Sequence, residues 1–171
     1  MKELSEELRT MAREQGLCDQ WFGEWKDDSD DETLFDKYKR GIDFCIKHEY
    51  PSLEYIRSHW DEDELEENGI FVDAKGVTVR RPPLIAVVNG ESEVTFDCGD
   101  FDVSDIYVRH NSRVRVVANG HARIMINLYD GASATVDCGG EGRVYVSKHG
   151  TTCLVEDVGE NESRVHYCDA N

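Results

Sequence analysis

Residues 113–148 read RVRVVANGHARIMINLYDGASATVDCGGEGRVYVSK, and this stretch carries the pattern that decides the fold. The apolar triplets Ile124-Met125-Ile126 and Val144-Tyr145-Val146 repeat along it at a fixed interval. A second pair of triplets, Val114-Arg115-Val116 and Ala134-Thr135-Val136, has the same spacing, and polar corners rich in Gly, Asn and Asp separate all four. An antiparallel meander has loops of freely varying length, whereas a fixed period of about 20 residues is typical of stacked coils. The stretch therefore predicts a parallel β-solenoid.

The same period continues on both sides of this stretch. The spacing between the first residues of successive triplets changes little within either series. The pattern predicts about four coils of roughly 20 residues each over residues 84–171. The first series is Ile85-Ala86-Val87, Ile106-Tyr107-Val108, Ile124-Met125-Ile126, Val144-Tyr145-Val146 and Val165-His166-Tyr167, and the second is Val94-Thr95-Phe96, Val114-Arg115-Val116, Ala134-Thr135-Val136 and Cys153-Leu154-Val155.

The N-terminal part of the chain has the periodicity of helices instead. Leu4, Leu8 and Met11 form one helical stripe. Thr33 can cap a later helix whose apolar positions continue to about His48. We therefore predict an α+β protein in which an N-terminal helical head precedes the short parallel β-solenoid.

The junction between the two parts contains turn signals. Asn68-Gly69 predicts a change of direction, after which two short apolar runs, 70–72 and 77–79, suggest a small β-hairpin. Arg81-Pro82-Pro83 forms a stiff link to the first coil. The expected organisation is an acidic helical head (1–69), a β-hairpin and proline junction (70–83), and the β-solenoid (84–171).

The net charge of −17 limits the classes of partner. Residues 1–75 carry 22 acidic and 10 basic side chains, whereas residues 76–171 carry 14 and 9. Because phosphate contacts need a positive surface, we expect no direct nucleic-acid binding. The acidic runs of the head are either solvated helix ends or a contact surface for a cationic partner, such as a basic nucleic-acid-binding protein. The residues of this acidic surface are Asp27, Asp28, Asp30, Asp31, Glu32, Asp61, Glu62, Asp63, Glu64, Glu66 and Glu67.

The six cysteines are predicted to be free thiols. Cys98 and Cys138 occupy the same corner two coils apart, in an inward column with Ala118 and Val158. Their backbones would be roughly 9–10 Å apart, which is beyond disulfide reach. The cysteine and histidine spacings are not those of metal sites, and no phosphate loop or nucleophile elbow occurs, so we expect no metal, cofactor or enzymatic activity. The charged N-terminus and the absence of a long apolar run predict a cytoplasmic protein that does not bind membranes.

One face of the predicted solenoid is a candidate binding surface. If the ends of each first-series triplet point inward, the middle residues form an outward column. Two positions earlier, three arginines follow Asp105. Guanidinium groups stacked about 5 Å apart repel one another by roughly 1 kcal/mol per neighbouring pair even in water, so an anion is expected nearby. The outward column is Ala86, Tyr107, Met125, Tyr145 and His166, and the predicted partner-binding face is Tyr107, Met125, Tyr145, His166, Arg123, Arg143 and Arg164.

The source of that anion is open at this point. It is either one of the protein's own acids, such as Asp105, Glu141 or Glu160, or an acidic patch of a partner, a second copy of the chain, or a phosphorylated ligand. A solenoid also exposes unpaired backbone groups at its ends. Since only Asp169-Ala170-Asn171 follows Cys168, we expect the C-terminal end to be open and to favour a homo-oligomer.

Two resemblances add to this interpretation. Arg123-Ile-Met-Ile-Asn127 and Arg143-Val-Tyr-Val-Ser147 resemble the repeats of bactofilin-type polymer-forming and adhesin-head β-solenoids, which implies self-assembly. The chain departs from the bactofilin pattern in having a helical head and few coils. With Arg40-Gly-Ile-Asp-Phe-Cys45 and Glu49-Tyr-Pro-Ser52, the whole chain is similar to small gut-bacterial and phage proteins with a helical head and a short solenoid, which implies no particular activity.

These observations lead to three functional hypotheses. The first is a non-catalytic adaptor or inhibitor that occupies a partner's surface, for example a phage-type counter-defence protein whose acidic head mimics nucleic acid. The second is a structural module that assembles with copies of itself through the solenoid ends. The third is a binder of nucleotides or other phosphorylated ligands on the arginine and tyrosine face.

Overall fold

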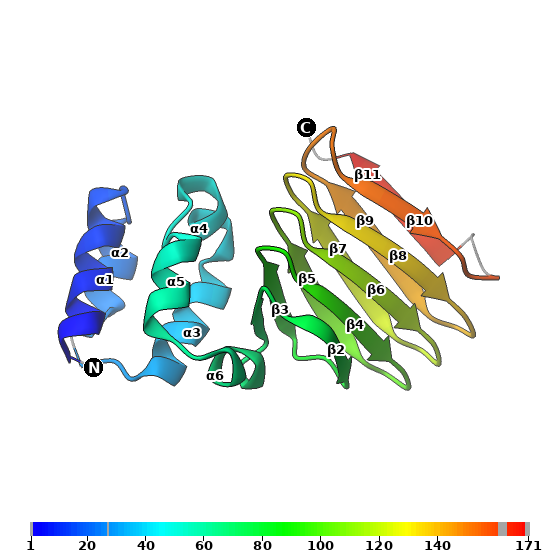
Figure 1. The fold of residues 1–171 in the computed structure, drawn as a ribbon, viewed down its shortest axis with the longest axis horizontal. Coiled ribbons are helices and arrows are strands. Elements are labelled where there is room, and N and C mark those ends of the chain that lie inside the picture. The colour runs from blue at the N-terminus through cyan, green and yellow to red at the C-terminus, as the bar shows by residue number, and fades with distance from the viewer. Residues whose placement is uncertain (1, 27, 161–163, 170–171) are drawn as a thin grey trace. The chain divides into compact units, whose positions relative to one another are not determined.

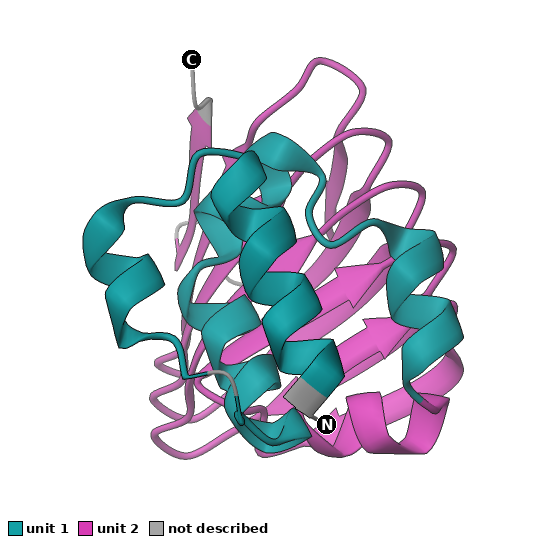
Figure 2. Cartoon of the chain, turned by 90° about the vertical axis from the view of Figure 1, so that its left-hand side faces the viewer, with its two compact units in different colours: residues 1–60 teal, residues 61–171 magenta. Residues whose placement is uncertain are grey.

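The computed structural model describes residues 2–26, 28–160 and 164–169 (Figure 1). Helices occupy the N-terminal part, and parallel strands form a solenoid of about five turns after it, so the predicted α+β class is confirmed. The chain divides into two compact units, residues 1–60 and 61–171 (Figure 2). The helices are α1 (Lys2–Glu14), α2 (Asp19–Glu24), α3 (Asp31–Arg40), α4 (Ile42–His48), α5 (Leu53–His59) and α6 (Glu62–Glu67).

Unit 1 is held together by the apolar faces of its helices and by long-range hydrogen bonds. Leu8 on α1 and Phe35 on α3 are buried. Trp25 donates its Nε1 proton to Ser5 Oγ over 3.1 Å, and Tyr50 Oη donates to the carbonyl of Leu8 over 2.5 Å. Segments that are distant in sequence are therefore fixed to adjacent turns of α1, at Ser5 and Leu8.

The helix predicted to run from Thr33 to about His48 is two helices. Gly41 separates α3 from α4, because glycine is a poor helix former and its N–H closes α3 by donating to the carbonyl of Lys37. The cap is also different from the prediction. Asp30 caps α3, and its Oδ1 accepts the backbone N–H of Thr33 over 2.9 Å.

Residues 70–80 are an additional coil of the solenoid and not a β-hairpin. β1 (Ile70–Val72) pairs in parallel with β3 (Ile85–Asn89), whereas β2 (Lys75–Arg80) pairs in parallel with β4 (Glu93–Cys98) in the other sheet. The helix α6 packs against β1, which places it in the solenoid unit. The hairpin prediction was wrong because this first coil, which leads from Ile70 to its partner Val87, is shorter than the later coils and falls outside their period.

The solenoid consists of two parallel sheets, and successive strands of the chain alternate between them (Figure 1). Sheet A has the order β1-β3-β5-β7-β9-β11, and sheet B has the order β10-β8-β6-β4-β2. Short corners, 129–132 and 139–142, connect β7 to β8 and β8 to β9. The remaining strands are β5 (Val103–Val108), β6 (Arg113–Ala118), β7 (Arg123–Leu128), β8 (Ser133–Cys138), β9 (Arg143–Lys148), β10 (Leu154–Asp157) and β11 (Val165–Asp169).

Alternate residues of every strand fill the space between the sheets. Ile106, Ile126 and Val146 stack in register in sheet A and are buried. At the N-terminal end, the rings of Phe71 and Phe96 cross the core with centroids 5.8 Å apart and planes at 90°. This edge-to-face contact between the two sheets stabilises the core beyond the contribution that comes from burying both rings.

The predicted column of cysteines is present in the core. Cys98 pairs with Ala118, which pairs with Cys138, and all three are fully buried. Val158 was predicted to continue this column but is exposed. Gly159 lies over Cys138 instead, because the coil that leads from Ser133 to its partner Leu154 is one residue longer than the coil before it.

Buried hydroxyl groups join neighbouring coils at the corners between sheets A and B. Ser92 Oγ donates to the carbonyl of Asn89 over 2.7 Å and accepts the N–H of Ala74 over 3.1 Å. Ser112 Oγ donates to the carbonyl of Gly90 over 3.0 Å and accepts the N–H of Ser92 over 3.3 Å. Each serine therefore satisfies backbone groups that the tight corner would otherwise leave unpaired.

Native thiol titration is expected to detect two of the six cysteines. All six are free, and burial raises the pKa of the Cys98 thiol to about 12, with Asp102 and Asp97 adding to the effect. Because only the thiolate reacts, such a thiol is nearly inert at pH 8. The buried cysteines are Cys45, Cys98, Cys138 and Cys153, and the exposed ones are Cys18 and Cys168.

A colorimetric thiol reagent at pH 8 measures this directly. The native chain should react rapidly at two thiols, and the chain in guanidinium chloride at all six. The variant with Cys18→Ser and Cys168→Ser is the control and should give almost no rapid reaction. Rapid reaction of a third thiol in the native chain would contradict the buried cysteine column.

Candidate interaction face

The outer face of sheet A is defined here as the outward side chains of β5, β7, β9 and β11, together with Arg164. The strand register arranges these side chains in columns that run along the solenoid. The arginine column is Val103, Arg123 and Arg143, with Arg164 immediately before the Val165–Val144 pair. The central column, two positions further along each strand, is Asp105, Met125, Tyr145 and His166.

The structure brings together most of the predicted partner-binding residues and moves one of them. Met125, Tyr145 and His166 share a column as expected. Tyr107 lies one column away, opposite Asn127, and Ala86 is fully buried opposite Ile106. The prediction failed for Tyr107 because the polar residue Ser104 occupies the inward position opposite Ile124, so the apolar alternation of β5 begins late. It failed for Ala86 because four apolar residues in a row in β3 do not show which of them point inward.

Asp105 was predicted to lie in the arginine column and instead lies in the central column. Its Oδ2 accepts a hydrogen bond from Tyr107 Oη over 3.1 Å, and its Oδ1 accepts one from Asn127 Nδ2 over 2.6 Å. The position in the arginine column that the sequence analysis assigned to Asp105 is occupied by Val103. Asp105 is therefore a partner of neutral side chains within the face.

The three arginines have different surroundings. Arg123 Nη1 donates to the carbonyls of His121, Ala122 and Glu141 over 3.1, 3.0 and 2.9 Å. Arg164 Nη2 forms an ion pair with Glu141 Oε2 over 2.9 Å. The side chain of Arg143 is exposed and forms no hydrogen bond or ion pair with any residue that the structure describes. One of the proposed internal acids, Glu141, therefore compensates only the last arginine of the column.

Apolar groups lie on both sides of the arginine column. In the central column, Met125 is 46% exposed and Tyr145 is 38% exposed, and the Tyr145 ring stacks on His166 with centroids 4.9 Å apart. At the corner before β5, Phe101 is 76% exposed and stacks on His121 at the same centroid distance. Phe101 was missed by sequence reasoning, although an aromatic residue between two aspartates at a polar corner is a usable signal.

The predicted acidic surface is divided between the two units. Residues 28–32 belong to unit 1 and α6 to unit 2, and Asp27 lies outside the described residues. Since α6 belongs to the solenoid unit, residues 1–60 carry 15 acidic and 9 basic side chains, and residues 61–171 carry 21 and 10. More of the negative charge therefore lies in unit 2 than the division at residue 75 indicated.

Several of these acids have structural roles. Asp30 caps α3, and its hydrogen bond with Thr33 lowers the pKa of the carboxyl. Asp31 accepts the Nε1 proton of Trp60 over 3.0 Å. Glu62, Asp63 and Glu64 form the first turn of α6, where negative charge is favourable. Burial, together with Glu62 and Asp63, raises the pKa of Glu66.

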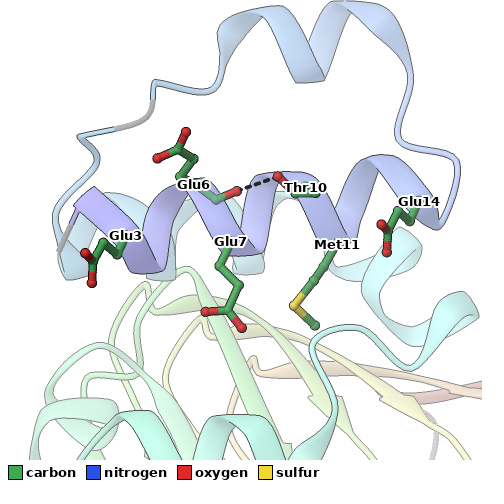
Figure 3. A pocket seen from close by; sticks show the side chains of 6 residues that line it. All are labelled: Glu3, Glu6, Glu7, Thr10, Met11 and Glu14. Atoms are coloured by element: carbon green, nitrogen blue, oxygen red, sulfur yellow. Dashed lines mark hydrogen bonds between the residues drawn. The ribbon is translucent and has the colours of Figure 1, made fainter.

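A second acidic surface, not predicted from the sequence, lies along α1. An open hollow of about 400 Å³ is lined by acidic side chains together with Thr10 and Met11 (Figure 3). Thr10 Oγ1 donates to the carbonyl of Glu6 over 2.8 Å. The acidic residues that line this hollow are Glu3, Glu6, Glu7 and Glu14.

Comparison with known proteins adds no family to this description. The chain matches no protein-family model, no curated protein and no solved structure. Among the described residues, no group of three or more His, Cys, Asp or Glu side chains is arranged to hold a metal ion. None of the described helices combines the length and apolar character needed to cross a membrane.

Proposed function

We propose that the protein is a non-catalytic interaction module that binds a partner protein through the outer face of sheet A. The observation that carries this proposal is the arginine column, flanked on both sides by exposed apolar side chains. Monomeric proteins rarely expose such groups together unless the surface binds something. The corners that join successive strands from β3 to β10 are too short to build the walls of an active-site cleft beside this face.

An adaptor or an inhibitor of the kind that phages encode would act in this way, by covering a partner's surface. Six free thiols support a reducing compartment such as the cytoplasm. A basic partner bound by the acidic helices is the weaker alternative, because helix capping and helix dipoles already account for several of those acids. A phosphorylated ligand would use the arginines but leaves the apolar flanks without a role.

Assembly of copies through the solenoid ends is also less favoured. Asp157 occupies an inward position opposite Val136, in a column that is otherwise apolar, with Val79, Phe96 and Val116. Inward charges on an edge strand oppose pairing with another strand. At the other end, α6 packs against β1. Both features argue against the filaments that the bactofilin resemblance implies, and against a homo-oligomer formed through these ends.

The proposal is tested by placing negative charge on the face. The double variant Met125→Glu and Tyr145→Glu should lose the partner that the native chain retains from an extract of its own cells, because both side chains are at the centre of the face. Its melting temperature should change little, since both positions point outward. Retained proteins are identified by mass spectrometry.

The matched control places the same charges on the opposite sheet. Thr95 and Thr135 lie in one outward column of sheet B, on either side of Arg115. The variant with Thr95→Glu and Thr135→Glu should retain the partner. Equal retention by both double variants would show that the outer face of sheet A is not the binding surface.

A further inference from the structure

We infer that the segment recognised by the outer face of sheet A is acidic and carries large apolar side chains, with its carboxylates paired to Arg123 and Arg143. This inference rests on the proposed function and specifies the chemistry of the partner. It starts from the arginines, because their surroundings differ and leave particular donors available.

Arg123 is fixed in position before any partner arrives. Its Nη1 donates to three backbone carbonyls, two in the corner between β6 and β7 and one in the corner between β8 and β9, and these contacts hold the guanidinium between the two corners. The Nε and Nη2 groups have no acceptor among the described residues. These two groups form one edge of the guanidinium, and that edge matches the two oxygens of a carboxylate. A side chain that is already ordered loses little entropy on binding.

Arg143 adds a second positive charge beside it. The two residues are paired in register on neighbouring strands, so their backbones lie about 4.8 Å apart. Arg164 is neutralised by Glu141, whereas the side chain of Arg143 has no partner among the described residues. Two adjacent like charges repel each other, so an anion that bridges them is favoured. Arg123 and Arg143 therefore form a local positive site on a chain whose net charge is −17.

The flanks of the arginine column decide which anion fits best. Phe101 and His121 lie on one side, and Met125 and Tyr145 lie on the other, two positions or about 6.6 Å along the strands. A polypeptide that crosses the column therefore meets apolar, cationic and apolar surfaces in turn. Nucleic acid is disfavoured by the negative field of the whole chain. A free phosphate makes no use of the flanks, whereas a segment with acidic and apolar side chains uses all three surfaces.

A library of random dodecapeptides displayed on filamentous phage provides the probe. Selection on the full chain should enrich peptides that combine aspartate or glutamate with aromatic or aliphatic residues. The enriched peptides are then synthesised with a fluorescent label, and their dissociation constants are measured by anisotropy. Each Arg→Gln substitution should weaken binding about tenfold, because a charge-assisted pair is lost.

Arg113 supplies the matched control. It is exposed on β6 of sheet B and, like Arg143, is the first residue of its strand. Arg113→Gln should leave the dissociation constant unchanged. The melting temperature of every variant is measured to confirm that the chain is folded.

The outcomes separate the inference from the proposed function. Peptides that are neutral or basic, or that bind Arg123→Gln and Arg143→Gln as well as the native chain, would overturn the inference. If those peptides were still lost from the Met125→Glu and Tyr145→Glu variant, the proposed function would stand. If no peptide were enriched, or if enriched peptides bound all the variants equally, both would fail.

Discussion

Replacing Phe96 with alanine is expected to destabilise the solenoid by about 3–5 kcal/mol, the range typical of a buried phenylalanine. Phe96 is fully buried between Val79 and Val116 in one inward column, and its ring meets Phe71 of the opposite sheet edge-to-face. The parallel sheets cannot collapse around the missing ring, because their spacing is held by the coils above and below. Urea unfolding followed by circular dichroism measures the loss.

Thr95→Ala is the control for this substitution. Thr95 is adjacent on the same strand but points outward and is half-buried, so its loss should cost less than about 1 kcal/mol. A cost for Phe96→Ala close to that of Thr95→Ala would mean that Phe96 is not part of the packed core.

Gly120→Ala is expected to lower the free energy of unfolding by roughly 2–5 kcal/mol. Two separable effects contribute, a strained backbone conformation and a steric clash. Gly120 has a φ of +56°, and this left-handed conformation costs an alanine about 1–2 kcal/mol. A Cβ atom there would also lie 2.7 Å from the backbone nitrogen of Asp100 in the preceding coil. Relieving that clash moves one corner away from the next and adds about 1–3 kcal/mol.

Gly76→Ala isolates the conformational effect. Gly76 has a φ of +69°, but no atom lies within 4 Å of the added Cβ. Its substitution should therefore cost only the conformational part, about 1–2 kcal/mol. Asp100, with a φ of 44°, already shows that this corner conformation accepts a side chain where the space allows it. Equal losses of free energy of unfolding for the two variants would rule out the close approach between corners.

The fold was predictable wherever the chain keeps its period. Val103, Arg123 and Arg143 follow one another at equal spacing in the sequence and are paired in the structure, so counting along the chain was enough to find the coils. The first coil was missed because its step, from Ile70 to Val87, is shorter. Its inward residues Phe71, Val77 and Val79 are apolar like those of the later coils, but its shorter step hides it from a search for a fixed spacing.

The candidate face was predictable in part. Met125, Tyr145 and His166 were placed correctly because their triplets have apolar residues on both sides. Tyr107 was not, because the inward side chain of Ser104 is polar and is satisfied by the carbonyl of Pro83, over 2.7 Å. An alternation of apolar and polar residues does not reveal such a position. The contacts of Arg123 with three carbonyls depend on corner geometry, which residue types alone do not specify.

The regular register has a consequence for the size of the binding surface. Residues 123–142 form one complete coil, because Arg123 and Arg143 are paired and the corners that precede them are also in register. Duplicating this segment would lengthen the sheet by about 4.8 Å and add one arginine and one methionine to the face. The helix α6 at the N-terminal end of the solenoid and the C-terminal coil with Asp157 would be unchanged. The area of the surface is thus set by the number of coils, independently of the two ends that terminate it.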